Sequence, residues 1–374
     1  MIPDVYHIIP GNEQGGGATH IIALARAVRD SNLAERFHFF TVGEGALAVS
    51  LRLEGIIVGE IPRPPLQAVR TLYREMVRSD KQAIWHAHGP RMNLWTCLAA
   101  SLSRRIWTST VHSDIFGDFL SKAWKNRFLP QLNRRCLQHC AGLFTGNRTF
   151  LKTFPGKPGF FVPNALTTAQ LPSSKTLYRE QLRQQLGLSA RTPVIGTVAR
   201  LDPVKDLTTL LRAVVYLPEV HLVLVGDGPD RLMLKTLAEE LGIAARTHFF
   251  GFLQDVGPIY AGLDVHVLPS RSEGGSPYAL LEAGFYGAAN VGSDVPGIRS
   301  LLEDEVTGLL FTQGDPPSLA AAVQRLLVDI DLRQRVIREF NHRILPKYTP
   351  AAMLAAYVQG YEQLVKLIRS KNHG

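Results

Sequence analysis

The chain has few cysteines and lacks any apolar run long enough to cross a membrane. The three cysteines, Cys97, Cys136 and Cys140, are an odd number without framework spacing, which excludes a disulfide scaffold and predicts reduced thiols. Cys136 and Cys140 could share one helix face, but two thiols alone do not make a metal site. No stretch of roughly 18 or more apolar residues occurs, so we expect no transmembrane helix. Residues 1–9 predict a first strand rather than a signal peptide, and we therefore expect a cytoplasmic protein.

Acidic residues are scarce in the first half of the chain. Residues 1–170 hold 20 Lys and Arg against 11 Asp and Glu, whereas residues 171–374 hold 21 of each kind, so the first half carries the whole net charge of +9. A one-sided basic surface predicts an anionic partner such as a phospholipid membrane, a lipid-linked pyrophosphate or nucleic acid. Ordinary arginine-rich solubility explains the excess equally well. The usual nucleic-acid-binding signatures are missing, so nucleic acid is not expected as a partner.

Apolar strand-like runs alternate with amphipathic segments of helical length along the whole chain. In the first half the predicted strands are residues 5–10, 37–42, 56–61, 83–88, 106–111, 143–145 and 159–162, with a helix over 19–30. In the second half the predicted strands are 193–198, 221–225, 248–250 and 265–269, with helices over 206–215, 230–241 and 278–286. This alternation predicts an α/β protein with parallel sheets that are covered by helices on both faces.

A polar segment with a proline, TTAQLPSSK over residues 167–175, separates the basic half from the neutral half. We therefore predict an N-terminal domain over 1–170, a second domain over 171–350 and a C-terminal helix over 351–374. Open parallel sheets bind ligands at the carboxyl ends of their strands. The loops that follow predicted strands are accordingly the places to look for chemistry.

Two such loops carry groups that suit a phosphate. Gly15, Gly16 and Gly17 follow the first strand and open the first helix, where backbone amides and the helix N-terminus favour an anion; a flexible turn is the alternative interpretation. Arg200 and Lys205 lie in the loop after residues 193–198, just before a helix. Two cations there suit a pyrophosphate, although they could equally be solvated surface charges.

Two further loops follow strands of the second half. Gly226 begins the turn Gly-Asp-Gly-Pro, which predicts a structural role near a nucleotide. The segment SRSEGGSPYALLEA over 270–283 places Glu273 after a strand, then a glycine-rich turn, then a helix that contains Glu282. This arrangement offers carboxylates for sugar and ribose hydroxyls and free amides for phosphate. A glutamate on an otherwise apolar helix face is unusual unless it is paired or faces a ligand.

Together these motifs resemble a known family. The segments VARLDPVKD, VGDGPD, SRSEGGSPYALLEAG and SDVPGIRSLLEDEVTGLLF resemble the donor domain of family 4 glycosyltransferases, which have the GT-B fold. GGGATH, VHSD over 111–114 and VPNAL over 162–166 resemble further motifs of that family. The resemblance implies two Rossmann-like domains facing each other across a cleft, with the C-terminal helix packing back on the first domain. It also implies transfer of a sugar from a nucleotide-sugar, by family habit a UDP-sugar, with retention of anomeric configuration.

The resemblance also implies a role for individual residues. Gly15 and Gly16 would approach the donor phosphate, and Arg200 and Lys205 would neutralise the pyrophosphate. Glu273 would hold hydroxyls of the donor sugar, with the amides of Gly275 and Ser276 nearby, and Glu282 would hold the ribose. The backbone of Phe252 and Leu253 would contact the nucleobase, and His112 would lie near the reacting centre. Eight residues separate Glu273 from Glu282, whereas the family pattern has seven, and the additional residue lies in the glycine-rich turn.

No metal or other cofactor is expected. Asp329-Ile330-Asp331 has the spelling of a metal-binding Asp-x-Asp site, but no predicted strand precedes it and we interpret it as a solvated helix face. His86 and His88 would point to one face of a strand, and no third zinc ligand is evident in the sequence.

The acceptor is left open as a saccharide or a lipid-linked saccharide of cell-surface polysaccharide or glycoconjugate biosynthesis. Residues 116–140 mix aromatic and basic side chains, which fits either the inner face of a membrane or a helix packed on its own domain. A nucleotide-sugar epimerase, a sugar phosphorylase and, less favoured, a basic nucleic-acid-binding protein are the competing interpretations. Turnover of a UDP-sugar without acceptor would identify an epimerase.

Overall fold

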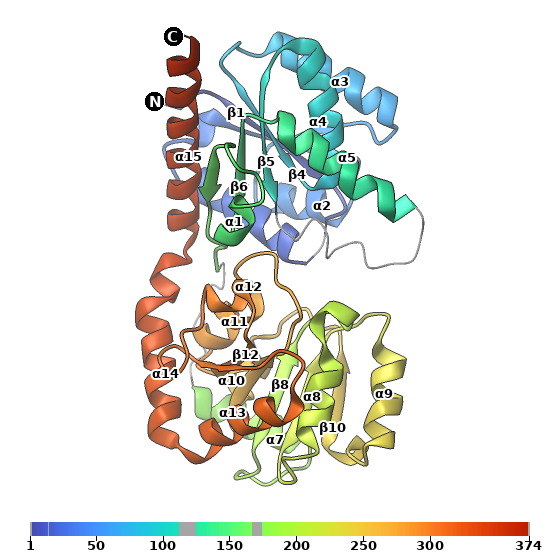
Figure 1. The fold of residues 1–374 in the computed structure, drawn as a ribbon, viewed down its shortest axis with the longest axis vertical. Helices are drawn as coiled ribbons and strands as arrows, with labels where there is room; N and C mark the ends of the chain where they lie inside the picture. Colours follow the sequence, from blue (N-terminus) through green and yellow to red (C-terminus); the bar gives the residue numbers. More distant parts are fainter. Residues whose placement is uncertain (1, 14, 112–124, 167–173, 373–374) are drawn as a thin grey trace. The chain divides into compact units, whose positions relative to one another are not determined.

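The computed structural model describes residues 2–13, 15–111, 125–166 and 174–372. The chain forms two compact units, Met1–Thr167 with Thr349–Gly374, and Thr168–Tyr348. Each unit is built on one parallel sheet with helices on both faces, as the alternation in the sequence predicts (Figure 1).

The sheet of the first unit has seven strands in the order β3-β2-β1-β4-β5-β6-β7. The strands are β1 Val5–Pro10, β2 Phe37–Val42, β3 Val58–Ile61, β4 Ile84–His88, β5 Ile106–Val111, β6 Gly142–Thr145 and β7 Gly159–Phe161. All pair in parallel, and β4 is buried along its whole length. Burial on both faces is typical of parallel strands and explains why they appear in the sequence as continuous apolar runs.

Two layers of helices cover this sheet. The helices are α1 Gly16–Arg29, α2 Ala46–Leu53, α3 Pro65–Arg78, α4 Pro90–Ser103, α5 Lys125–His139, the short α6 Arg148–Leu151 and α15 Pro350–Asn372. Apolar side chains of α1, α2 and α15 share one core cluster, and those of α3, α4 and α5 share another. Figure 1 shows α15 running alongside the first unit, so the prediction that the C-terminal helix packs back on that unit is confirmed.

Buried polar side chains fasten α15 to the sheet. The Tyr357 hydroxyl lies 2.7 Å from Thr110 Oγ1 and 2.8 Å from His20 Nε2. The Tyr361 hydroxyl lies 2.8 Å from His86 Nδ1. Both tyrosines are fully buried, and burial raises the pKa of each phenol, so both are uncharged. The helix is therefore held by directional hydrogen bonds as well as by its apolar face.

The sheet of the second unit has six strands in the order β10-β9-β8-β11-β12-β13. The strands are β8 Val194–Val198, β9 His221–Val225, β10 Thr247–Gly251, β11 Val265–Leu268, β12 Ala289–Ser293 and β13 Leu309–Phe311. The helices are α7 Lys175–Gln185, α8 Leu207–Val214, α9 Arg231–Glu240, α10 Gly257–Gly262, α11 Tyr278–Phe285, α12 Pro296–Arg299, α13 Pro316–Val328 and α14 Ile330–Arg343. Apolar residues of α8, α9 and α13 form the core on one face, and those of α7, α10 and α11 form the core on the other.

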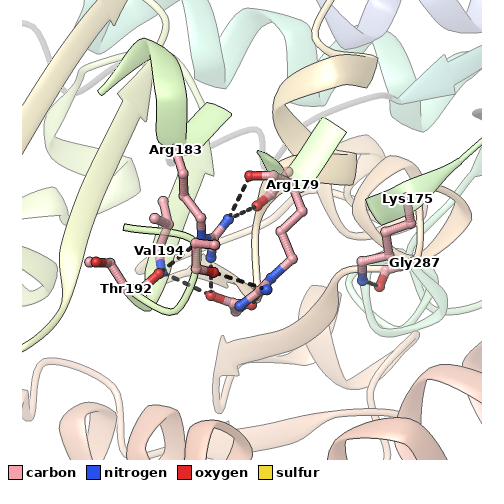
Figure 2. Close-up of polar contacts among 9 residues, drawn as sticks. Lys175, Arg179, Arg183, Thr192, Val194 and Gly287 are labelled. Atoms are coloured by element: carbon pink, nitrogen blue, oxygen red, sulfur yellow. Dashed lines mark hydrogen bonds and ion pairs between the residues drawn. The ribbon is translucent and has the colours of Figure 1, made fainter. Parts of the chain in front are cut away.

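A buried ion pair holds the amino ends of the two central strands, β8 and β11. Arg183 of α7 donates to Asp264 Oδ2 over 2.6 Å, and the backbone amide of Val194 donates to the same oxygen over 2.9 Å. Arg179 donates to the other carboxylate oxygen over 3.0 Å (Figure 2). Val194 begins β8 and Asp264 directly precedes β11, so one carboxylate fixes both strands at this end. Lys175 extends the contacts of α7 by donating to the carbonyl of Gly287.

Candidate functional site

The strand order of the second unit fixes where a ligand site should lie. From β8 the chain continues to β9 and β10 on one side, and β11 to β13 are added on the other side. The loops after β8 and β11 therefore leave neighbouring strands in opposite directions. In open parallel sheets, this point of reversal at the carboxyl ends of the strands is where ligands bind. Both loops carry the charged residues that the sequence singled out.

An ion pair joins these two loops. Lys205 Nζ lies 2.6 Å from Glu273 Oε1, and the Ser270 hydroxyl donates to the same oxygen over 2.5 Å. The Glu273 side chain is 11% exposed and that of Lys205 is 23% exposed, so the pair is partly desolvated without being fully enclosed. Two of the predicted donor-binding residues thus lie in direct contact. Ser270 had no role assigned from the sequence, because nothing there shows that its hydroxyl supports the glutamate.

Further hydrogen bonds join the two loops and hold Asp206 in place. Asp206 accepts from Arg271 over 3.1 Å and from the Thr209 hydroxyl over 2.9 Å. The backbone amide of Arg271 donates to the carbonyl of Val204 over 2.8 Å. Asp206 is buried and has a left-handed backbone conformation with φ of 47°, which the sequence did not suggest. Because this conformation is costly outside glycine, the aspartate contacts are needed to maintain it.

Arg200 is the most accessible of the predicted cations. Its side chain is 72% exposed and is paired with Asp202. Asp202 also accepts from the backbone amides of Val204 and Lys205, at 3.1 and 3.2 Å, and so caps the 3₁₀ turn Pro203–Lys205. An aspartate before a proline is the sequence signal for such a cap. The result is a loop in which the Arg200 guanidinium is paired with Asp202 while the side chain as a whole stays largely exposed.

Gly226 allows the floor of this loop to form. Its φ is 125°, and a Cβ at this position would lie 1.9 Å from the carbonyl oxygen of Ala199. The following turn also contacts the loop, since the amide of Leu201 donates to the carbonyl of Asp227 over 3.0 Å. Only glycine permits this close approach of two backbones. Gly226 therefore positions the segment that carries Arg200, in agreement with the structural role expected for the turn.

Glu282 is a half-buried carboxyl on α11. Burial raises its pKa from the ordinary value of 4.5 to about 7, and the neighbouring Tyr260 hydroxyl opposes this shift. Tyr260 is fully buried, and burial followed by the charge of Glu282 raises its own pKa. A carboxyl that titrates near neutrality in this way is a candidate functional group. A ligand hydroxyl that donated to it would stabilise the ionised form.

The glycine-rich turn between the two glutamates packs against α12. A Cβ on Gly297 would lie 2.5 Å from the Cβ of Glu273 and 2.9 Å from the carbonyl oxygen of Gly275. The hydroxyl of Ser276 is buried and lies 3.1 Å from those of Ser300 and Tyr348. The Ser276 side chain therefore fastens the turn to the end of α12 and to Tyr348.

The other predicted positions lie at separate places in the fold. Phe252 and Leu253 directly follow β10, and the Phe252 ring is 79% exposed, which leaves an aromatic surface at this edge of the sheet. In the first unit, Gly15 precedes α1 with φ of 66°, and Gly16 and Gly17 form its first turn, which contains no acidic residue. His112 lies outside the described residues.

A third histidine joins the pair that the sequence suggested as zinc ligands. His7, His86 and His88 are buried, and one nitrogen of each lies within 4.8 Å of the others. His7 and His88 share a hydrogen bond of 2.8 Å, whereas both nitrogens of His86 contact hydroxyls. The rings of His7 and His86 are stacked with 27° between their planes, so their in-plane lone pairs do not converge. Burial lowers the pKa of His7 to about 3, and we interpret the cluster as an uncharged hydrogen-bonded network.

Known proteins resemble the second unit in sequence and the whole chain in fold. Residues 178–343 match the family model described as glycosyl transferases group 1. The lipopolysaccharide core biosynthesis glycosyltransferase LpsE of Rhizobium meliloti is 32% identical over 179 residues, which cover 47% of this chain and 52% of LpsE. The chain thus spans about half the length of the curated relatives it matches.

Two solved structures share the fold over nearly the whole chain. HepE from Anabaena in complex with UDP-glucose superposes with a TM-score of 0.79 at 20% identity, covering 98% of this chain and 99% of HepE. A glycosyltransferase from Rickettsia africae superposes with a TM-score of 0.75 at 15% identity, covering 98% and 99%. The predicted fold class, two Rossmann-like units of the GT-B type, is confirmed. Residues 178–343, which include every candidate residue from Arg200 to Glu282, are similar in sequence to glycosyl transferases of group 1.

Proposed function

We propose that the protein is a glycosyltransferase that moves a sugar from a nucleotide-sugar donor to an acceptor hydroxyl. The observation that carries this proposal is the junction of the loops after β8 and β11, where Lys205 and Glu273 meet beside the exposed Arg200. A diphosphate needs cations that are fixed before it arrives, and a sugar needs hydrogen-bond acceptors. Both kinds of group occur here, since Lys205 Nζ lies 2.6 Å from Glu273 Oε1. The match of residues 178–343 to glycosyl transferases supports the same assignment.

In the proposed reaction, the bond between the sugar C1 and the diphosphate oxygen breaks, and a bond from C1 to the acceptor oxygen forms. The diphosphate leaves with the bonding electron pair, and its departing oxygen takes up the proton that the acceptor hydroxyl loses. Lys205 and Arg200 stabilise the negative charge that develops on the leaving diphosphate. Glu273 binds hydroxyls of the donor sugar, Glu282 binds the ribose, and the edge at Phe252 and Leu253 contacts the nucleobase. We further propose that His112 lies near the reacting centre.

We also propose a donor nucleotide, a stereochemical course and a reaction without a metal ion. UDP is the proposed nucleotide, and the complex of HepE with UDP-glucose supports this choice. Retention of configuration is proposed from the resemblance to family 4. No metal is needed in this scheme, because Lys205 and Arg200 take the role that a cation bound by carboxylates would otherwise have. The amides of Gly15, Gly16, Gly17, Gly275 and Ser276 are proposed to contact phosphate.

The acceptor is proposed to be a saccharide or a lipid-linked saccharide of cell-surface biosynthesis. The lipopolysaccharide core function in the name of LpsE supports this class. The lipid part of such an acceptor would bring the enzyme to the inner face of a membrane.

A thermal-shift panel of UDP-, GDP- and ADP-sugars, each with EDTA or with Mg²⁺, tests the proposal. A ligand that binds the native state raises the melting temperature, and we expect the largest rise with a UDP-sugar, independent of Mg²⁺. Lys205→Met should lower the rise, because the variant binds the diphosphate more weakly. The control Arg325→Met removes a surface ion pair with Glu305 on the same unit and should leave the rise intact. No rise with any nucleotide-sugar in the wild-type protein would refute the proposal, and conversion of the donor without acceptor would indicate an epimerase.

A further inference from the structure

We propose that the outer face of α3, α4 and α5 binds an anionic phospholipid surface. These helices lie side by side on one face of the first sheet, and their inner sides form a single core cluster (Figure 1). This face is made by described residues of the three helices, and it includes no residue of the donor site in the second unit.

Large apolar side chains point outward along this face. On α3, Leu66, Arg70, Tyr73 and Val77 follow the spacing i, i+4, i+7 and i+11, so they form one stripe opposite the buried side of the helix. Leu66 is 89% exposed. The apolar stripe continues on the neighbouring helices through Leu98 and Leu102 of α4 and Leu132 of α5. Exposed apolar residues that cluster in this way mark an interaction site, whereas single ones need no explanation.

The same face is strongly basic. The sequences of α3, α4 and α5 contain eight Lys and Arg and a single acidic residue, Glu75. Glu75 pairs with Arg78 at 3.1 Å. The described residues provide no ion-pair partner for the other exposed arginines, which are Arg70, Arg74, Arg91, Arg134 and Arg135. Most of the positive charge on α3, α4 and α5 therefore has no acidic partner among the described residues.

The opposite face of the sheet shows that this is not a general property of the unit. The arginines of α1 and α2 are neutralised locally: Arg26 pairs with Glu54, Arg29 with Asp30 and Arg52 with Glu44. Leu53 at the end of α2 and Ile57 after it are 84% and 92% exposed, but the arginines of α1 and α2 are paired. Helices α1 and α2 therefore differ from α3, α4 and α5, where exposed apolar residues lie among arginines that have no acidic partner in the described part of the chain.

This combination fits a lipid headgroup layer better than other anions. Leucine and valine side chains gain free energy in the acyl region, whereas guanidinium groups bind the phosphates above it. A nucleic acid would use the arginines but gain little from exposed leucines, and the aromatic residue of the stripe is a single tyrosine. Among the described residues, no helix is long and apolar enough to span a bilayer, so the contact would be made by side chains at the surface.

Sedimentation with vesicles tests the proposal on the full chain. We expect binding to vesicles of phosphatidylcholine with about 30% phosphatidylglycerol, weak binding to pure phosphatidylcholine, and loss of binding in high salt. Arg70→Gln/Arg74→Gln should lower the partition coefficient by about 25-fold, since each arginine near an anionic surface contributes about fivefold. Leu98→Ser/Leu102→Ser should lower it at least about tenfold.

The matched control is Leu53→Ser/Ile57→Ser on the opposite face, which should change the partition coefficient by less than about twofold. Equal loss in this control, or equal binding to both kinds of vesicle, would overturn the proposal. Absence of binding by the wild-type protein would do the same. Binding of a short RNA that depends on the arginines but not on Leu98 and Leu102, without vesicle binding, would instead assign the face to nucleic acid and overturn it.

Discussion

Replacement of Glu282 by Gln should make the second unit more stable at alkaline pH. The native pKa of Glu282 is raised by burial from 4.5 to about 7, so the native state holds a proton that the unfolded chain releases at lower pH. A raised carboxyl pKa means that stability is greatest below pH 4.5 and is lost as the pH rises through 7. The shift corresponds to about 3 kcal/mol. Glutamine has no ionisable proton, so the variant does not lose stability in this way as the pH rises.

The assay is thermal unfolding of wild type and Glu282→Gln at pH 5 and pH 8. At pH 8 the variant should melt about 6–12 °C higher than the wild type, because a unit of this size shifts by about 2–4 °C for each kcal/mol. At pH 5 the difference should fall to a small fraction of this value. A difference of the same size at both pH values would refute the reasoning, since it would show that burial of the ionised carboxylate is not the cause.

The same carboxyl links stability to the proposed function. If ribose hydroxyls donate to Glu282, the ligand stabilises the carboxylate and lowers its pKa. The affinity for UDP should then increase between pH 6 and pH 8 more steeply in the wild type than in Glu282→Gln, which corrects for titration of the nucleotide. Identical pH dependence in the two proteins would show that the ligand does not contact this group.

Two further substitutions test the packing and the buried histidines. Gly226→Ala should destabilise the second unit by about 2–5 kcal/mol, because the new Cβ would lie 1.9 Å from a backbone oxygen at a φ of 125°. The control Gly242→Ala has positive φ but open space and should cost about 1 kcal/mol in unfolding experiments; equal costs would contradict the argument. His20 has a pKa lowered to about 4 by burial, so its contribution to stability is lost as the pH falls from 6.5 through 4. His20→Gln should remove about 3 kcal/mol of this acid sensitivity in denaturant titrations at pH 4 and pH 7, and an unchanged pH slope would exclude it as the source.

The fold could be predicted from the sequence because its strands are buried on both faces. Each predicted strand is found within about two residues, since continuous apolar runs bounded by turn residues have few other interpretations. Helix α4 was harder to predict. Its inner side contains Met92 and Trp95, but Leu98 and Leu102 are exposed on its outer side, so the alternation of apolar and polar residues that indicates a helix is weak.

The loops that carry the candidate site could be identified from the sequence, but the contacts between their side chains could not. Lys205 and Glu273 were singled out because each follows a strand, and the sheet order brings them to one edge. Their ion pair depends on a contact between residues 68 positions apart, which a single sequence does not encode visibly. The contacts of Ser270 with Glu273 and of His7 with the other two histidines could not be predicted, because a single sequence does not show which side chains meet in the fold. Asp206 was missed for another reason, because its left-handed backbone is set by tertiary contacts rather than by local preference.

Titration calorimetry of UDP into the wild type, Lys205→Met and Arg325→Met is the most direct test of the central claim, that the loops after β8 and β11 bind a diphosphate. Loss of one charged hydrogen-bond donor should weaken UDP binding by about 10- to 100-fold in Lys205→Met, whereas Arg325→Met should bind like the wild type. Equal affinity in all three proteins would contradict the account.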